Sequence, residues 1–238
     1  MWHFQKIDPL LLLAGRKYIS VVGGGGKSTI IEFLAGRQAM AGKSVALTTT
    51  TRIYAKEPFI LFSDFESFSR GPATRVGKTH EDGKLTGLAF EEVRSLGESA
   101  DTVLIEADGA KHFPLKFPAP HEPVVPPFSD RIFVVGGLDA LHCTVEKAVF
   151  RWKLLPDPGE IAGDTVISEE IFLSFFSERA MLKDVERRKC TIILNKYDLL
   201  RDRGEAFHLA KALLDRKKCA EVVVSSAALG FFYKLAHA

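Results

Sequence analysis

A run of four glycines followed by a lysine, a serine and a threonine is the part of the sequence best suited to chemistry. Glycine has no Cβ, so the backbone N–H groups of such a run can turn toward one anion. A lysine at this spacing reaches the outer phosphates of a nucleotide, and the serine hydroxyl can ligate Mg²⁺. The run predicts a site for a nucleoside triphosphate with Mg²⁺, formed by Gly23, Gly24, Gly25, Gly26, Lys27, Ser28 and Thr29.

The glycine run departs from the common phosphate-binding pattern GxxxxGK[ST], because Val21 stands at the position of its first glycine. It does match the tail GGxGK[ST]. A second interpretation is a glycine-rich turn that only packs a helix on a strand. That interpretation does not explain why Lys27 and two hydroxyl residues begin a predicted helix, where the helix dipole favours an anion. We therefore expect nucleotide binding.

An acidic segment, residues 106–109, follows a fully apolar predicted strand. A carboxylate at the carboxyl end of a parallel strand lies where ligands of open α/β sheets bind, and there it can organise Mg²⁺ and the attacking water. Asp108 is the metal-side acid if the pattern is a strand-end carboxylate, and Glu106 is that acid if the pattern is ExxG. Gly109 would let the backbone approach a γ-phosphate. The alternative is an acidic turn after a strand.

The segment 195–198 follows another apolar strand and has the NKxD form that reads guanine. Asp198 would accept hydrogen bonds from guanine N1–H and the 2-amino group, Asn195 would brace neighbouring backbone, and the Lys196 stem would lie against the base. Ser226 and Ala227, after the next strand, could present N–H groups to guanine O6. Adenine lacks both donors, so the pattern favours GTP over ATP. The alternative is a polar turn that simply follows a strand.

Four threonines and an arginine, residues 48–52, leave the second predicted strand at its ligand-facing end. Hydroxyl groups can ligate Mg²⁺, and an arginine matches phosphate oxygens bidentately. We expect Thr50 to act as a metal ligand, with Thr51 beside it, and Arg52 to sense the γ-phosphate. The alternative is a threonine-rich strand end, because threonine favours strands.

A proline-rich loop, residues 114–127, holds six prolines in fourteen residues and is not expected to form regular structure. Polar residues that could contact a substrate or a partner, or act in a lid that responds to the nucleotide, surround this loop. They are Lys111, His112, Lys116, His121 and Glu122.

These segments must be positioned by alternating strands and helices. Strands are predicted at 18–22, 44–47, 102–105, 131–135, 190–194 and 221–224. Helices are predicted at 10–17, 29–41, 90–96, 145–155, 169–178 and 205–216. The strand–loop–helix–strand order predicts one α/β domain over residues 1–238, with a mostly parallel sheet flanked by helices. Residues 57–88 are expected to add a hairpin at the sheet edge, around the turn Asp82-Gly83.

Composition narrows the class of protein. The net charge of +2 gives no sign of a nucleic-acid binder. Three widely spaced cysteines form no zinc-type pair and fit a reducing cytoplasm better than a disulfide framework. The apolar run at residues 9–14 is too short to span a membrane. We expect a cytoplasmic protein that does not associate with membranes.

Taken together, the GGGGKST run, the threonine–arginine run, EADG and the segment PLKFPAPHEPVVPP resemble the YqeC-type selenium-dependent hydroxylase accessory proteins. More widely, the chain is similar to the SIMIBI branch of P-loop GTPases, and its ExxG segment to GTPases of metallocentre assembly. Val22 stands where many of them carry a signature lysine, and the chain lacks their Cys- or His-based metal motif. The resemblance implies a role in maturing a molybdenum hydroxylase, with a client enzyme or assembly factor as partner and a nucleotide-bridged homodimer as one mode of action.

Three functions are compatible with these features. The first is a maturation GTPase with slow intrinsic turnover, in which Lys27, Arg52, Glu106 and Asp108 carry the chemistry and a partner completes the site. The second is a small-molecule kinase using ATP or GTP, with the proline-rich loop and the hairpin forming an acceptor pocket. The third is a scaffold that binds nucleotide without turnover.

Overall fold

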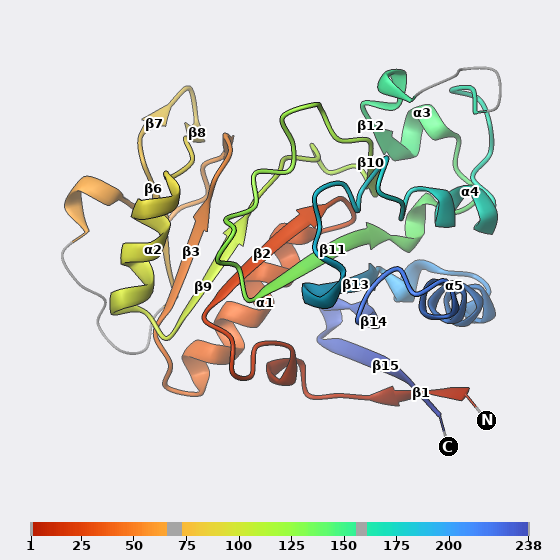
Figure 1. The fold of residues 1–238 in the computed structure, drawn as a ribbon, viewed down its shortest axis with the longest axis horizontal. Coiled ribbons are helices and arrows are strands. Elements are labelled where there is room, and N and C mark those ends of the chain that lie inside the picture. The colour runs from red at the N-terminus through yellow and green to blue at the C-terminus, as the bar shows by residue number, and fades with distance from the viewer. Residues whose placement is uncertain (1, 66–72, 156–160, 238) are drawn as a thin grey trace.

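The computed structural model describes residues 2–65, 73–155 and 161–237, and within them the largest element is a ten-stranded sheet (Figure 1). In spatial order its strands are β1 (Trp2–Lys6), β15 (Phe231–His237), β14 (Glu221–Ser226), β13 (Cys190–Asn195), β11 (Arg131–Gly137), β2 (Tyr18–Gly23), β9 (Thr102–Glu106), β3 (Val45–Thr49), β6 (Ala73–Gly77) and β5 (Phe59–Leu61). From β14 to β5 all neighbours are parallel, whereas β15 and β1 add antiparallel strands at one edge. The α/β class and the mostly parallel sheet are confirmed.

Helices cover both faces of this sheet, which is why its central strands are apolar along their whole length. The α-helices of the described residues are α1 (Lys27–Met40), α2 (Phe90–Ser99), α3 (Val145–Ala148), α4 (Glu169–Ser174) and α5 (Arg203–Asp215). On one face, Ile30 and Leu34 of α1 share a core cluster with Leu104 of β9. The next residue along β9, Ile105, points to the other face and packs with Leu96 of α2. The sheet therefore forms the middle of three layers (Figure 1).

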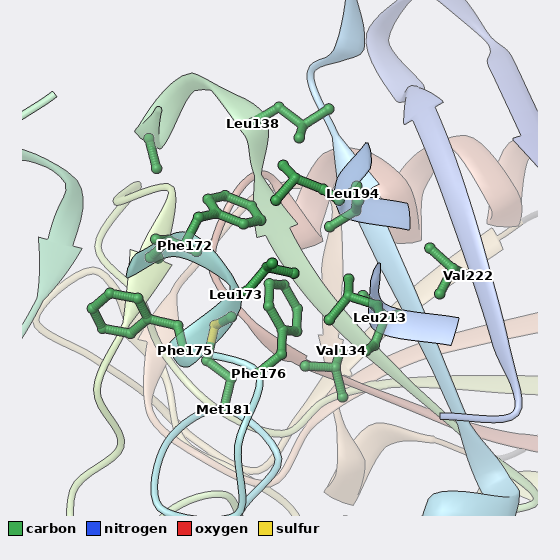
Figure 2. Packing of buried hydrophobic residues seen from close by; sticks show 14 of the residues in the cluster. Val134, Leu138, Phe172, Leu173, Phe175, Phe176, Met181, Leu194, Leu213 and Val222 are labelled. Atoms are coloured by element: carbon green, nitrogen blue, oxygen red, sulfur yellow. The ribbon is translucent and has the colours of Figure 1, made fainter. Parts of the chain in front are cut away.

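An aromatic cluster closes the α4 side of the core (Figure 2). Phe172 and Phe176 are fully buried, with ring centroids 5.6 Å apart, and they share the cluster with Val134 of β11 and Leu213 of α5. Each such buried phenylalanine contributes about 1.5–3 kcal/mol of transfer free energy. A Cβ on Gly136 would lie 2.7 Å from the Phe176 ring. The cluster thus fixes the carboxyl end of β11, on which the glycine run rests.

Two small sheets lie at the carboxyl ends of the main strands. One pairs β10 (Leu115–Lys116) with β12 (Val149–Phe150) in parallel. The other joins β4 (Ile53–Tyr54), β8 (Lys84–Leu85) and β7 (His80–Glu81) in antiparallel fashion. The Asp82-Gly83 turn does connect two paired strands, but this hairpin pairs with β4 and not with the main sheet, whose edge is formed by β6 and β5. Residues 66–72 of the predicted insertion lie outside the described residues.

Several predicted elements were wrong. The segment predicted as a helix at 145–155 divides into α3, β12 and a 3-10 turn, because Arg151 adopts a left-handed backbone with φ 61°. The predicted proline-rich loop contains the two residues of β10. Strands β1 and β15 were not predicted. Short 3-10 turns complete the described structure at Pro9–Leu12, Phe62–Asp64, Leu138–Ala140, Trp152–Leu154, Arg187–Lys189, Tyr197–Leu199 and Ala227–Leu229.

Cysteine chemistry and membrane spans can be assessed from the described residues. The three cysteines are free thiols; Cys190 and Cys219 are buried, and burial raises the pKa of Cys219 to about 11. Raised thiol pKa values make thiolate ligands or nucleophiles unfavourable at neutral pH. Across residues 2–65, 73–155 and 161–237, no helix combines the length and apolar character needed to cross a bilayer.

Candidate nucleotide site

The glycine run forms the turn between β2 and α1, and it leaves the first N–H groups of the helix open. Gly26 is the N-cap residue of α1, has φ 103° and provides no side-chain cap. The N–H groups of Gly26, Lys27, Ser28 and Thr29 therefore have no intrahelical acceptor. These four residues line a cavity of about 840 Å³. An uncapped helix N-terminus facing a cavity is suited to an anion.

Close packing explains why side chains are excluded from the glycine run. A Cβ on Gly23 would lie 2.3 Å from the carbonyl oxygen of Val135, and one on Gly25 would lie 2.1 Å from the N atom of Gly137. A Cβ on Gly24 would lie 2.6 Å from a carbonyl oxygen at the start of the proline-rich segment. The run is therefore pressed between β11 and that segment. Val21 is fully buried within β2, so the position that the pattern GxxxxGK[ST] gives to its first glycine is a core position in this chain.

Lys27 is the cation of the site and is almost completely buried, with 4% of its surface exposed. Its Nζ donates to the Gly23 carbonyl oxygen at 2.6 Å and lies 3.1 Å from Asp108 Oδ1 and 3.9 Å from Glu106 Oε1. Both Asp108 oxygens also accept from the Gly23 N–H, at 3.1 and 3.0 Å. The lysine and both acids predicted from separate motifs are therefore brought together, because β2 and β9 are neighbouring strands.

A chain of alternating charges leads from this lysine into the proline-rich segment. Asp108 Oδ2 lies 3.0 Å from Nζ of Lys116, which is fully buried and donates to Glu122 Oε2 at 2.7 Å. Arg151 donates to the same Glu122 oxygen. Burial by itself raises the pKa of Glu122, but hydrogen bonds from Lys116 and Arg151 hold that pKa below its usual range. The order Lys27–Asp108–Lys116–Glu122–Arg151 connects the glycine run to β12.

Glu106 and Ser28 are the pair that could hold Mg²⁺. Ser28 Oγ donates to Glu106 Oε2 at 3.2 Å, so two hard oxygen donors of the type that Mg²⁺ prefers converge beside the helix N-terminus. The other two predicted metal ligands have protein partners. The Thr50 hydroxyl donates to the Val124 carbonyl oxygen at 2.6 Å, and the Asp108 carboxylate forms ion pairs with two lysines. Among the described residues no group of three or more His, Cys, Asp or Glu side chains could hold a metal, so any ion here needs further oxygen ligands.

The ionisation of Glu106 is unfavourable in the fold. Burial raises the pKa of Glu106, Lys27 counteracts this, and the nearby Asp108 carboxylate adds to the rise. A raised carboxyl pKa means that the folded state disfavours the charged form, so this side chain lowers stability wherever it is ionised in the unfolded chain. A carboxyl group that destabilises the fold in this way is compatible with a role in ligand binding.

We expect Glu106→Gln to raise the midpoint of thermal unfolding of the metal-free protein at neutral pH. The neutral amide removes the free-energy cost of holding a charged carboxylate in this buried place. The gain should disappear below about pH 4, where glutamate is protonated in both states. Thermal unfolding measured beside Glu178→Gln, at an exposed glutamate, checks this. A lower midpoint for Glu106→Gln would contradict it.

Asn195 connects the end of β13 to the glycine run. Its Nδ2 donates to the Gly25 carbonyl oxygen at 2.8 Å, and its Oδ1 accepts from the Ala227 N–H at 3.1 Å and from the Ser225 hydroxyl at 2.9 Å. The bracing contacts expected of the asparagine are therefore present. They bring two predicted segments, at 195–198 and 225–227, against the side of the glycine run.

The other residues predicted to contact the base lie close to Asn195. Lys196 has φ 66° and its Nζ lies 2.7 Å from Asp139 Oδ2, while Asp139 Oδ1 is buried without a hydrogen-bond partner among the described residues. Asp198 is exposed, and its N–H donates to Ser226 Oγ at 3.0 Å. None of the predicted base-reading residues lines the 840 Å³ cavity. These residues therefore lie outside the cavity, connected to the glycine run through Asn195 and Gly25.

Arg52 is directed to the β7–β8 hairpin and is half exposed. Its Nη2 lies 3.3 Å from Asp82 Oδ2 and 3.4 Å from the Glu81 carbonyl oxygen. It still lines the cavity, as do Thr50 and Thr51. Arg52 is therefore placed at the cavity wall with an acid partner and not on the glycine run.

Sequence reasoning missed several charged residues of the cavity. Glu32 of α1 accepts from Lys56 at 2.5 Å and from Arg75 at 2.9 Å. Arg151 and Phe150, from a segment predicted as helix, also line the cavity. No local motif marks these residues, because only tertiary contacts bring them to the site. Lys116 and Glu122 were named from the sequence as polar residues of the proline-rich loop, but their partner Arg151 was not.

Comparison with known proteins places these features in a family. A family model described as YqeC protein matches residues 19–153, which is more than half of the 238 residues. The chain belongs to the YqeC family. The matched range contains the glycine run, Glu106, Asp108, the proline-rich loop and Arg151. The segments around Asn195 and Ala227, which the sequence predicts to contact the base, lie beyond the family match.

A similar protein from Escherichia coli K12, named uncharacterized protein YqeC, is 31% identical to this chain over 162 residues. The alignment covers 63% of this chain, and the chain spans 63% of the length of that relative. The printed name of this relative agrees with the family match and assigns no activity.

Proposed function

We propose that this chain is a Mg²⁺-dependent GTP-binding protein that hydrolyses GTP slowly and acts in the maturation of a molybdenum hydroxylase. The observation that carries the proposal is the buried Lys27, held by Asp108 and the Gly23 carbonyl oxygen beside an uncapped helix N-terminus. Burial of a lysine does not by itself require an open helix N-terminus or a neighbouring cavity. Both are accounted for by a phosphate chain.

The phosphates would lie against the N–H groups of Gly26, Lys27, Ser28 and Thr29. Lys27 now donates to a carbonyl oxygen and a carboxylate, and a phosphate oxygen would replace these acceptors with a stronger, charge-assisted contact. The strand order supports the narrower assignment to a P-loop GTPase of the SIMIBI type. In that order β9 lies directly between β2 and β3, so its terminal acids reach the phosphate loop.

Glu106 is proposed as the acid on the metal side, together with Ser28. Asp108 is the less suitable choice because Lys27, Lys116 and the Gly23 N–H already occupy its carboxylate. Asp108 would instead hold the loop and the lysine in position. When bound between these residues and the nucleotide, Mg²⁺ would supply positive charge that neutralises charge developing during hydrolysis.

The base would lie at the segments joined by Asn195. Asp198 is exposed and bears no ion pair within the described residues, so its carboxylate is available to the guanine N1–H and 2-amino donors. The Lys196 stem is fixed by its contact with Asp139, whose buried Oδ1 is still without a donor among the described residues. These features support GTP as the nucleotide.

Slow intrinsic turnover and dependence on a partner follow from the arginines of the cavity. Arg52 pairs with Asp82, Arg75 with Glu32, and Arg151 with Glu122. Among the described cavity residues each arginine is thus committed to an acid, and none is ready to stabilise transition-state charge. The client, a molybdenum hydroxylase or its loading factor, is proposed from the family resemblance alone.

Affinity capture in two nucleotide states tests this proposal. Protein loaded with Mg²⁺ and a non-hydrolysable GTP analogue should retain a molybdenum hydroxylase subunit or a factor that loads its cofactor, and GDP-loaded protein should retain much less. Adding the purified partner should accelerate single-turnover GTP hydrolysis. Equal capture in both states, or capture of neither class of protein, would argue against the maturation role.

A further inference from the structure

The cavity beside the glycine run extends beyond the residues of that run. Beyond the helix N-terminus its wall is formed by the residues after the acidic strand end and by β12. We call Lys111, His121, Phe150 and Arg151 the outer pocket; all four line the cavity. A cavity of about 840 Å³ lies within the range of about 300–1,000 Å³ that is usual for small-molecule sites.

The outer pocket contains two permanent cations, and only one of them has a carboxylate partner among the described residues. Among the described residues no carboxylate pairs with Lys111, whose Nζ lies 5.6 Å from the Phe150 ring centroid. His121 is exposed and contacts no acid within the same residues. The guanidinium carbon of Arg151 lies 4.7 Å from the same ring centroid. Arg151 and Lys116 both donate to Glu122. Lys116 has a second carboxylate partner in Asp108, so Glu122 is available to Arg151, whereas Lys111 has no carboxylate partner among the described residues.

The backbone holds Lys111 in place at an energetic cost. Lys111 and His112 are consecutive non-glycine residues in the left-handed region, with φ 46° and 68°. Such residues are strained, and they cluster at ligand-binding segments. The following residue, Phe113, fixes the strained turn, because its carbonyl oxygen accepts from the Gly25 N–H at 3.0 Å. The cation is thereby positioned directly beside the phosphate loop.

We propose that the outer pocket binds a second ligand, a small organic molecule carrying a phosphate monoester, while GTP occupies the glycine run. Lys111 would contact the dianionic group, since it lies by the Phe150 ring. Arg151, whose Nη1 remains paired with Glu122, would contact it through its other guanidinium N–H groups. This assignment rests on the proposed function, because it places the second anion next to bound nucleotide. It makes the chain a protein with two ligands.

Calorimetric titration of nucleotide-loaded protein tests this. The protein is first saturated with Mg²⁺ and a non-hydrolysable GTP analogue, so that the glycine run is filled, and is then titrated with glycerol 3-phosphate at low salt. Lys111→Asn removes the cation and keeps a residue that tolerates the left-handed backbone, and Arg151→Ala removes the second cation. The exposed Lys147 of α3 provides the control Lys147→Ala.

We expect the wild type and Lys147→Ala to bind the ester alike, and each outer-pocket variant to lose about tenfold or more in affinity, as charge-assisted hydrogen bonds predict. Unchanged GTP-analogue affinity in the variants shows that the fold is intact. No binding of the ester, equal binding by all variants, or tighter binding of inorganic phosphate than of the ester would overturn the inference while leaving the GTP proposal standing.

If the wild type fails to bind the GTP analogue, the proposed function fails and the titration is made on nucleotide-free Lys27→Ala protein. Ester binding that still depends on Lys111 would support the outer pocket on its own. Absence of such binding would overturn it.

Discussion

Asp198→Asn is expected to change the nucleotide preference of the protein from GTP to xanthosine triphosphate. The proposed contact of Asp198 is a carboxylate accepting two hydrogen bonds from guanine, and an amide would meet one of these donors with its own N–H₂ group. Two hydrogen bonds to a charged group correspond to a loss of about 100- to 10,000-fold in GTP affinity. Xanthine carries an oxygen where guanine has its amino group, so it restores the pairing.

Competing titrations with GTP, xanthosine triphosphate and ATP measure this change. Asp198 is exposed and its side chain bears no ion pair among the described residues, so the thermal midpoint should remain close to that of the wild type. Asp164→Asn, at another exposed aspartate, is the matched control and should leave all three affinities unchanged. If Asp198→Asn also leaves them unchanged, the guanine assignment is wrong.

Lys27→Ala is expected to abolish tight binding of every nucleoside triphosphate. Lys27 is buried beside the proposed phosphate site, and removal of one partner of a buried charge pair costs about 3–5 kcal/mol, which is a loss of about 100- to 1,000-fold or more. The residue contacts phosphate and not the base, so GTP and ATP should be affected alike. This pattern differs from that of Asp198→Asn, which changes the preference among bases.

The same titrations on Lys43→Ala provide the control, because Lys43 is exposed beyond the end of α1. Its affinities should equal those of the wild type. Lys27→Ala also leaves Asp108 with Lys116 as its remaining lysine partner, so the folded state of the variant must be verified by its thermal unfolding. GTP affinity within about threefold of the wild type in a folded Lys27→Ala protein would exclude the proposed phosphate contact.

Local patterns predicted the main elements well. The strand, glycine run and helix at residues 18–41 were found because apolar periodicity and the glycines lie within one short segment. Adjacency of β2 and β9 then brought Lys27, Glu106 and Asp108 together, as the parallel arrangement implies. The motifs left open which acid would face a metal, and the pairing of Asp108 with Lys27 and Lys116 is a tertiary feature that no motif contains.

Features built from distant contacts could not be predicted. Lys116, Glu122 and Arg151 form one buried network, but they lie in two segments without a common motif. Strands β1 and β15 pair the two ends of the described chain, so neither carries a local signal of its neighbour. The 145–155 segment has helical periodicity, and the left-handed Arg151 that ends the pattern results from tertiary packing.

Calorimetric titration of the wild-type protein with GTP and with ATP, each with Mg²⁺, tests the central claim most directly. We expect one GTP site per chain and affinity for GTP at least about tenfold above that for ATP, because adenine offers neither donor to Asp198. Equal affinity for the two nucleotides would contradict guanine recognition. Absence of binding by both would contradict the nucleotide site itself.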